Sequence, residues 1–344
     1  MSPLLRMTAD RRRAVFEETA ARMGLSSASV EKDYWVSLTL AILFSLDPWG
    51  RHLVFKGGTS LSKGWKLIER FSEDIDIVID RGALGYSGDQ DPAQAGSRKK
   101  RGKLLDALRL SAQLHVERDI LPALRSAYQS TIPDPLEWNV DLDPNDPDHQ
   151  SILFSYPTVF PDTARYLRKA VKIEMGARSD TDPSETVEIR SLISEQFPVL
   201  SAPEPALVRA VRPVRTFWEK LMLLHEETYR PDDKRRRKRG MSRHYYDVFR
   251  LIQQGVAQDA IQDMSLFRRI VAHREVYFNY TWMDYSTFNP GSLRIIPTET
   301  QFQDWRDDYH NMQGEMLYGA VPSFDEVISL IQEFQNQFNA VGSP

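Results

Sequence analysis

Residues 51–80, RHLVFKGGTSLSKGWKLIERFSEDIDIVID, constrain the fold more than any other stretch of this chain. His52 to Phe55 is short and mostly apolar, which indicates a buried strand. Gly57 and Gly58 break this strand, because glycine lets the backbone turn where a side chain would clash. Isoleucine and valine mark a second strand at residues 74–79. The stretch therefore predicts a strand, a glycine turn, a helix and a second strand.

The segment between these strands is expected to be helical. Leu61, Trp65 and Ile68 recur at helical spacing, and Thr59 or Ser60 can cap the helix. The first N–H groups of a helix carry a partial positive charge and suit a phosphate group. The turn and the start of the helix are therefore a candidate phosphate-binding element.

Asp74 and Asp76 are the candidate metal ligands of this stretch. Residues two apart on a strand share a face, so both carboxylates point the same way, while Ile75 and Ile77 point into the core. Two adjacent carboxylates repel, and Mg2+, which prefers oxygen ligands and phosphates, is the usual compensation. A glycine turn followed by Asp-x-Asp on a strand is typical of phosphoryl-transfer sites. The plainer alternative is an exposed acidic strand end beside an ordinary turn.

The segment KGGTSLSKGWKLIERFSEDIDI resembles the first motif of the AbiEii/AbiGii nucleotidyltransferase toxins, a family that includes the MenT proteins of type IV toxin–antitoxin systems. The resemblance implies an α/β protein with a mixed sheet: a polymerase-β-like nucleotidyltransferase core, N-terminal helices, and a helical C-terminal lobe that closes over the nucleotide. It also implies Mg2+, with Mn2+ as an alternative, and an NTP substrate. The nucleotide-binding residues expected from it are Gly57, Gly58, Thr59, Ser60, Lys63 and Ser72.

The composition excludes several other kinds of protein. The chain has no cysteine, which removes disulfides, Cys-ligated zinc and thiol catalysis. No apolar run approaches the ~20 residues of a membrane span, and the N-terminus lacks a signal-peptide core. We therefore expect a cytoplasmic protein.

Although the net charge of the chain is −4, the sequence contains two strongly basic runs. Residues 98–103 read RKKRGK and residues 234–239 read KRRRKR. Such runs are often only solvated loops, but on an enzyme of this kind they indicate a surface that faces RNA. The candidate RNA-binding residues are Lys234, Arg235, Arg236, Arg237, Lys238 and Arg239.

Residues 169–177, KAVKIEMGA, alternate as a half-buried strand does, with Ile173 on the apolar face and Glu174 on the other. A nucleotidyltransferase sheet commonly offers a third carboxylate from a neighbouring strand, and the family has a matching motif. Glu174 is therefore the candidate third metal ligand beside Asp74 and Asp76. The alternative is a solvent-facing glutamate on an edge strand.

The rest of the chain is expected to supply helices on both sides of the core. Helices are predicted at 8–47 and over 97–128, and the proline-punctuated residues 198–213 indicate an exit from the catalytic domain. The expected domains are a nucleotidyltransferase domain at 1–205, with N-terminal helices at 1–50 and a catalytic core at 51–205, and a helical C-terminal domain at 206–344.

Lys220 and Asp247 are candidate catalytic residues on two predicted helices, 216–227 and 242–253. Each lies at an apolar helix face, where a charge is costly unless it meets a partner, an anion or water. Arg243 or Lys220 could be the partner of Asp247. Glu219-Lys220-Leu221 and SRHYYDVFRL resemble two further family motifs, the second with His244 and Val248 as departures.

The resemblance implies transfer of a nucleotide from an NTP to an acceptor hydroxyl, with Asp74, Asp76, Lys220 and Asp247 as catalytic residues. In several members of the family the acceptor is the 3′ end of tRNA, which blocks translation and growth. An antitoxin of the AbiEi-like repressor type is implied, although direct contact with it is not. Two alternatives remain: nucleotidylylation of a protein side chain, and a non-catalytic module that binds NTP or RNA.

Overall fold

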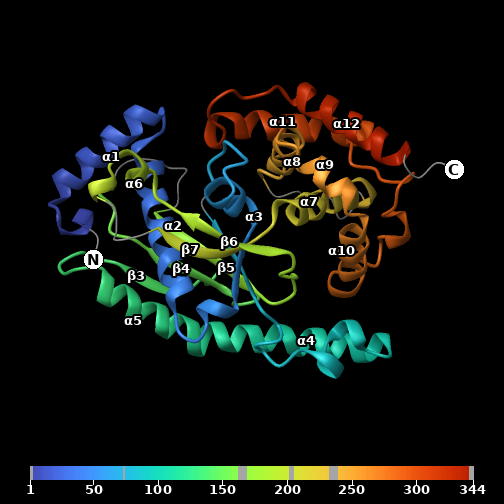
Figure 1. Cartoon of the computed structure of the whole chain (residues 1–344), viewed down its shortest axis with the longest axis horizontal. Coiled ribbons are helices and arrows are strands. Elements are labelled where there is room, and N and C mark those ends of the chain that lie inside the picture. The colour runs from blue at the N-terminus through green and yellow to red at the C-terminus, as the bar shows by residue number, and fades with distance from the viewer. Residues whose placement is uncertain (1–2, 73, 162–168, 201–204, 232–238, 341–344) are drawn as a thin grey trace. The chain divides into compact units, whose positions relative to one another are not determined.

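The computed structural model describes residues 3–72, 74–161, 169–200, 205–231 and 239–340. The chain divides into two compact units (Figure 1). The first consists of Met1–Gly64 and Ser72–Val211, and the second of Trp65–Phe71 and Arg212–Pro344. The short segment Trp65–Phe71 therefore leaves the first unit between the glycine turn and the aspartate strand.

A mixed sheet of seven strands forms the centre of the first unit, in the order β3-β4-β5-β2-β1-β7-β6 within the described residues. β2 is parallel to β5 and β1 is parallel to β7, whereas the other neighbouring strands are antiparallel. The α/β class with a mixed sheet is confirmed. The strands are β1 (Leu53–Lys56), β2 (Asp74–Ile79), β3 (Asn139–Leu142), β4 (Ser151–Ser155), β5 (Ala170–Gly176), β6 (Ser184–Ile189) and β7 (Ala206–Val211).

The first long helix of this unit begins and ends at local capping signals. Thr8 caps the first long helix and accepts a hydrogen bond from the Arg11 N–H, and Gly24 ends that helix in the left-handed conformation. The longer elements are α1 (Ala9–Met23), α2 (Ser27–Ser45), α4 (Arg98–His115), η6 (Val116–Ile120), α5 (Leu121–Thr131) and α6 (Leu192–Gln196). The short ones are η1 (Pro3–Arg6), η2 (Gly50–His52), α3 (Gly57–Thr59), η3 (Ser60–Gly64), η4 (Gly88–Gln90), η5 (Pro92–Gln94) and η7 (Pro198–Leu200).

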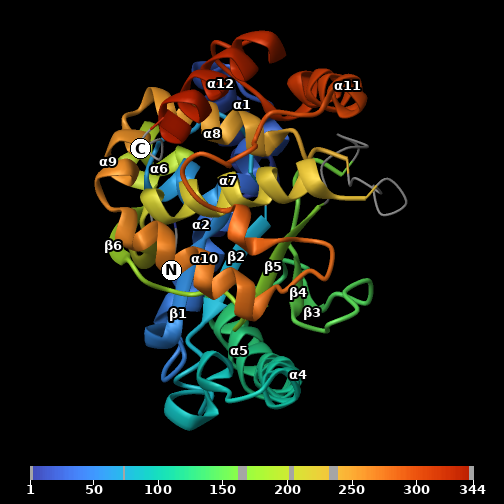
Figure 2. The ribbon, with the colours of Figure 1, turned by 90° about the vertical axis from the view of Figure 1, so that its right-hand side faces the viewer.

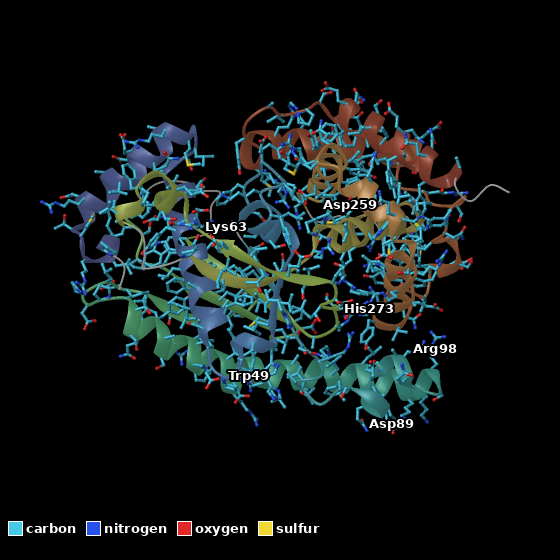
Figure 3. All side chains as sticks on the ribbon, in the orientation of Figure 1. Trp49, Lys63, Asp89, Arg98, Asp259 and His273 are labelled. Carbon is cyan, nitrogen blue, oxygen red and sulfur yellow. The ribbon has the colours of Figure 1, made fainter. Side chains whose placement is uncertain are left out.

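One face of the sheet is covered by α2 and α5. The Phe154 ring of β4 stacks on Tyr128 of α5 at 3.9 Å and meets Trp35 of α2 edge-on at 5.8 Å. Figure 1 shows α4 and α5 end to end, and Figure 2 shows both below the strands. Trp49, labelled in Figure 3, packs edge-on against His115 of α4, with ring centroids 5.2 Å apart. These aromatic contacts show that the face toward α2 and α5 is the apolar one, so polar side chains are expected on the opposite face.

Register places the acidic residues on that opposite face. Phe154 pairs with Val171, which shares a face with Ile173, and Ile173 pairs with Ile75. All of these side chains are buried. Because neighbours in a strand alternate, Asp74 and Asp76 point away from α2 and α5.

One expectation about this unit is wrong. The helix after the glycine turn ends at Gly64, so Trp65 and Ile68 lie beyond it, and Lys66 has a left-handed φ of 54° that no helix contains. Strand β7 was not predicted: it lies within residues 198–213, the expected exit from the catalytic domain, and it pairs with β1 in the sheet. The prolines that flank this strand at 203, 205 and 213 hid it from a pattern-based prediction.

The second unit is helical in the residues described. Its core is aromatic: the Trp218 ring lies 4.8 Å from Phe267 and 5.5 Å from Phe338, and Tyr245 meets Trp305 edge-on. No helix of the described residues is long and apolar enough to span a membrane. The helices are α7 (Pro213–Tyr229), α8 (Arg243–Gln253), α9 (Val256–Gln262), α10 (Met264–Tyr277), η9 (Tyr285–Thr287), α11 (Glu299–Met316) and α12 (Phe324–Ala340).

Candidate functional site

The first unit presents a carboxylate face on β2 and β5, which we define as Asp74, Asp76 and Glu174. Asp74 is exposed and Asp76 is half-buried. Asp76 lies in register with Glu174, and Asp74 lies in register with Lys172. The strand geometry thus brings together three carboxylates that the sequence singled out.

Lys172 is a cation on this face that sequence reasoning did not single out. Its ammonium forms an ion pair with the Glu174 carboxylate and lies 4.0 Å from Asp143. Partial burial opposes the charged form, but hydrogen bonding to Glu174 and the charges of Glu174, Asp74 and Asp143 outweigh it and raise the pKa of Lys172. Lys172 therefore remains an ammonium and offsets part of the repulsion among the carboxylates.

Gly57 is fixed by the carboxylate of Asp76. Its φ is +78°, and a Cβ atom at this position would lie 2.0 Å from Asp76 Oδ2. A side chain is excluded for both reasons, because the left-handed conformation favours glycine and the space is taken. The glycine turn and the aspartate strand are therefore one structural element and not two neighbouring motifs.

The hydroxyls of the turn are used internally. The helix cap is Lys56, which makes no side-chain capping bond, so the expected caps Thr59 and Ser60 are wrong. The Thr59 hydroxyl lies 2.7 Å from the Ser72 hydroxyl and donates to the Asp74 carbonyl. The Ser60 hydroxyl donates to the Gly57 carbonyl at 3.0 Å. Both side chains are fully buried, and these bonds tie the turn to the start of β2.

Lys63 follows the same turn, on η3 (Figure 3). Its ammonium forms a close ion pair with the Asp33 carboxylate of α2, with both side chains about nine-tenths buried. The other oxygen of Asp33 accepts the Leu192 backbone N–H at 2.7 Å. Lys63 thus joins the turn to the N-terminal helices, a contact that its position in the sequence did not indicate.

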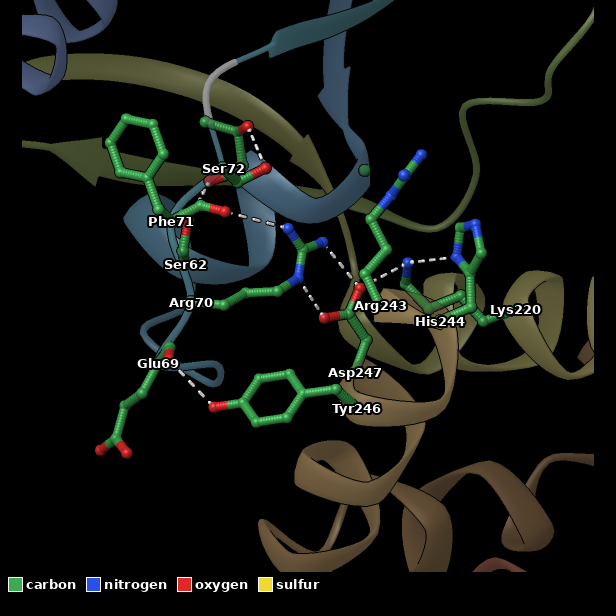
Figure 4. A network of polar contacts seen from close by, with 12 residues as sticks. Ser62, Glu69, Arg70, Phe71, Ser72, Lys220, Arg243, His244, Tyr246 and Asp247 are labelled. Atoms are coloured by element: carbon green, nitrogen blue, oxygen red, sulfur yellow. Dashed lines mark hydrogen bonds and ion pairs between the residues drawn. The ribbon is translucent and has the colours of Figure 1, made fainter. Parts of the chain in front are cut away.

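A second charged cluster lies wholly within the second unit (Figure 4). The Arg70 guanidinium donates from Nε to Asp247 Oδ1 at 2.6 Å and from Nη2 to Oδ2 at 2.8 Å. The Lys220 ammonium shares Oδ2 at 2.8 Å. Asp247 is fully buried, and although burial alone would raise its pKa, the two cations hold that pKa well below its usual range. Asp247 is therefore an ionised and weakly basic carboxylate.

Lys220 has a further contact in this cluster. Its ammonium lies 3.3 Å from His244 Nδ1, and burial together with the charges of Arg70 and Arg243 lowers the pKa of Lys220 against the pull of Asp247. Desolvation and the cations Lys220 and Arg243 lower the pKa of His244 well below its usual value, so its imidazole is neutral. The resulting Arg70–Lys220–Asp247–His244 cluster carries two positive charges and one negative charge.

Arg70 is the residue of this cluster that sequence reasoning missed. It comes from the segment Trp65–Phe71, and 177 positions separate it from Asp247. The segment is held by further bonds: the Phe71 N–H donates to the Met316 carbonyl at 2.7 Å, and the Tyr246 hydroxyl donates to the Glu69 carbonyl at 3.0 Å (Figure 4). Arg243, the other expected partner of Asp247, instead donates to the Gly240 carbonyl at 2.9 Å.

The carboxylate face suits Mg2+ through two ligands. No group of three His, Asp or Glu side chains among the described residues is arranged to hold a metal ion. Glu174 forms an ion pair with Lys172, and Asp74 and Asp76 are the two carboxylates that the same face of β2 presents side by side. Mg2+ is commonly held by one or two carboxylates, with substrate phosphates and water completing its shell. The donor set therefore fits the ion in its two-aspartate form.

The basic run 234–239 lies outside the described residues except for Arg239, which is exposed. The other run, 98–103, forms the first turns of α4, where Ser97 caps the helix and Arg98 is exposed (Figure 3). The predicted contact with RNA remains a prediction for both.

The family profile described as the nucleotidyl transferase AbiEii toxin of type IV toxin–antitoxin systems matches residues 39–330. The chain belongs to this family. The match begins within α2 and ends within α12, so the family region includes the carboxylate face and the buried cluster. The resemblance seen in the sequence is thereby confirmed, and membership in a toxin–antitoxin family implies an antitoxin partner.

Among solved structures, the chain is similar to the nucleotidyltransferase toxin MenT4 from Mycobacterium tuberculosis H37Rv. The two are 14% identical with a TM-score of 0.45, and the similarity covers 96% of this chain and 99% of MenT4. No curated protein matches the chain.

Proposed function

We propose that this AbiEii-family chain transfers a nucleoside monophosphate from an NTP to an acceptor hydroxyl, with the 3′ end of tRNA as the acceptor. The acceptor oxygen forms a bond to the α-phosphorus, and the bond from that phosphorus to the bridging oxygen breaks. Pyrophosphate leaves, and the hydroxyl proton passes to solvent. Modification of the acceptor end stops translation, which accounts for growth inhibition by a toxin.

The observation that carries this proposal is the approach of Gly57 to the Asp76 carboxylate. It joins a turn suited to phosphate and a strand suited to a divalent ion in one element. Since the Thr59 and Ser60 hydroxyls are used internally, the turn would contact phosphate through its backbone. Asp74 and Asp76 would hold Mg2+, which when bound polarises the phosphoryl oxygens and the acceptor hydroxyl.

Lys220 is the proposed cation for the triphosphate. Its cluster contains one more positive charge than negative, and a surplus charge in a desolvated site favours an anionic ligand. As pyrophosphate leaves, its growing charge would be stabilised by this ammonium. The depressed pKa of Asp247 makes it a poor general base, so we assign it to orienting Lys220.

The test is incubation with each labelled NTP, Mg2+ or Mn2+, and either total RNA or total protein. The proposal predicts label in RNA, at the 3′ end of tRNA, for the wild-type chain and not for Asp76→Asn. Asp141→Asn is the matched control, because Asp141 is an exposed carboxylate on strand β3 of the same sheet. Label in protein would favour the nucleotidylylation alternative, and NTP binding without label in either pool would favour the non-catalytic module.

A further inference from the structure

Arg70 and Lys220 do not share Asp247 equally. Arg70 contacts both carboxylate oxygens through the two arms of its guanidinium, whereas Lys220 contacts Oδ2 alone. A bidentate pair of this kind is stronger and more directional than a single ammonium contact. Arg70 is 3% exposed and Asp247 is fully buried, so solvent screens this pair little. The carboxylate is thus held mainly by Arg70.

The charge of the cluster follows from the same contacts. Two cations and one carboxylate meet a neutral imidazole, so the net charge is +1. Were Arg70 absent, Lys220 alone would balance Asp247, and the net charge would be zero. Arg70 therefore determines whether Lys220 only balances the charge of Asp247 or can also bind an anionic ligand.

We propose that Arg70 is a positioning residue for Lys220: by occupying both oxygens of Asp247, it leaves the Lys220 ammonium available to a phosphate group of the nucleotide. The inference deepens the proposed function and rests on it for the identity of the anion. It gives Asp247 a role that requires no proton transfer. It also explains why Arg70 belongs to a segment held to the rest of the second unit by further contacts, among them those with Met316, Tyr246 and Arg250.

Binding of inorganic pyrophosphate, measured by calorimetry from about pH 7 to about pH 10.5, tests the inference without any transfer reaction. The charged and titratable groups that face Lys220 are Asp247, Arg243 and His244 from α8 and Arg70 from the segment Trp65–Phe71. Burial and the charge of Arg70 lower the pKa of Lys220, so pyrophosphate affinity in the wild-type chain should begin to decrease at a lower pH than the one at which an ordinary lysine deprotonates.

Arg70→Gln should weaken pyrophosphate binding at neutral pH by about tenfold or more, because Lys220 becomes the sole counter-ion of Asp247. The alkaline fall in affinity should move to higher pH, because a neighbouring positive charge has been removed. Arg250→Gln is the matched control. Arg250 pairs with Glu69 of the same segment at 3.2 Å, so its loss loosens the segment without changing the charge around Lys220. Its affinity and pH profile should match the wild type.

Unchanged affinity and an unmoved profile in folded Arg70→Gln would overturn the inference, as would an equal loss in Arg250→Gln. If Arg70→Gln does not fold, Arg70→Lys carries the test. This variant keeps the positive charge but loses the bidentate contact. The pH dependence of its pyrophosphate affinity should match the wild type, and the affinity itself should lie between those of the wild type and Arg70→Gln. Wild-type affinity in Arg70→Lys would show that the bidentate contact is not needed. If the wild-type chain binds pyrophosphate but transfers no nucleotide, the proposed function is contradicted. The effect of Arg70→Gln on pyrophosphate affinity still tests the role of Arg70.

Discussion

Asp76 and Asp247 are the same residue type in opposite surroundings. Asp76 is half-buried, shares a face with Asp74 and lies in register with Glu174, so other carboxylates are near it. Asp247 is fully buried between Arg70 and Lys220. The surroundings of Asp76 favour a divalent cation as a further partner. The negative charge of Asp247, in contrast, is already balanced by the two protein cations beside it. Under the proposed function, these surroundings, rather than the side chains themselves, make Asp76 a metal ligand and Asp247 an orienting residue.

The largest loss of activity is expected from substitutions at the carboxylate face, which would remove the contrast between Asp76 and Asp247. Asp74→Ala or Asp76→Ala should abolish nucleotide transfer and growth inhibition, by about a thousandfold or more, because a bound metal contributes several kcal/mol to the transition state. The fold should be kept, and the melting temperature should be equal or higher since like-charge repulsion is relieved. Transfer assays and thermal denaturation of the same preparations measure both. Full transfer activity in Asp76→Ala would refute the assignment.

A change at Gly57 should disturb Asp76 without removing it. Gly57→Ala places a methyl group on the Asp76 carboxylate, so we expect transfer to fall by about a hundredfold, the loss seen when one preorganised contact is removed. Gly85→Ala is a matched control, because Gly85 also has a left-handed φ, +86°, but nothing lies within 4 Å of an added Cβ. Both variants bear a similar backbone strain of about 1–2 kcal/mol, because alanine disfavours the left-handed conformation. Equal activity in the two would mean that the approach to Asp76 is unimportant.

Lys220 and Asp247 should behave as one unit in transfer. Lys220→Ala should cost about 3 kcal/mol of transition-state stabilisation, as other preorganised electrostatic contacts do. The Lys220→Ala/Asp247→Ala double variant should be scarcely worse, because an orienting residue has no effect once its target is gone. Lys220→Arg should also be impaired, because a planar fork does not replace a compact charge. Steady-state kcat/KM values decide the matter: losses that simply multiply would assign Asp247 to the acceptor hydroxyl.

The periodicity of the sequence predicted elements well where one face is buried. Val171, Ile173 and Met175 alternate with polar residues, and that stretch is β5. Strand β7 was missed because prolines flank it. Local patterns therefore located the elements whose burial repeats along the chain.

Partners distant in the sequence could not be predicted in this way. Arg70 meets Asp247 across 177 positions, so no local pattern connects the two residues. The cap was misassigned because Thr59 and Ser60 carry suitable hydroxyls, but burial turned these toward Asp74 and Gly57. Side-chain type indicated the candidate residues, and only the tertiary contacts showed which partners Glu174, Lys220 and Asp247 have.

The smallest expected effect concerns the acceptor and not the nucleotide. Replacing four of the six residues from Lys234 to Arg239 by Ser should weaken RNA binding and flatten its salt dependence, since each phosphate contact contributes about −0.7 to −0.9 to the log–log slope. NTP affinity should be unchanged. Filter binding across a salt series measures the slope. An unaltered affinity and slope would make the run a solvated loop.

The central claim is that the α-phosphate of an NTP is transferred at Asp74 and Asp76. Its most direct test is incubation of the wild-type chain with total RNA, Mg2+ and an NTP labelled at either the α- or the γ-phosphate. The account predicts label in RNA from the α-labelled NTP alone, and from neither NTP with Asp76→Ala. Transfer of the γ-label, or undiminished transfer of the α-label by Asp76→Ala, would contradict it.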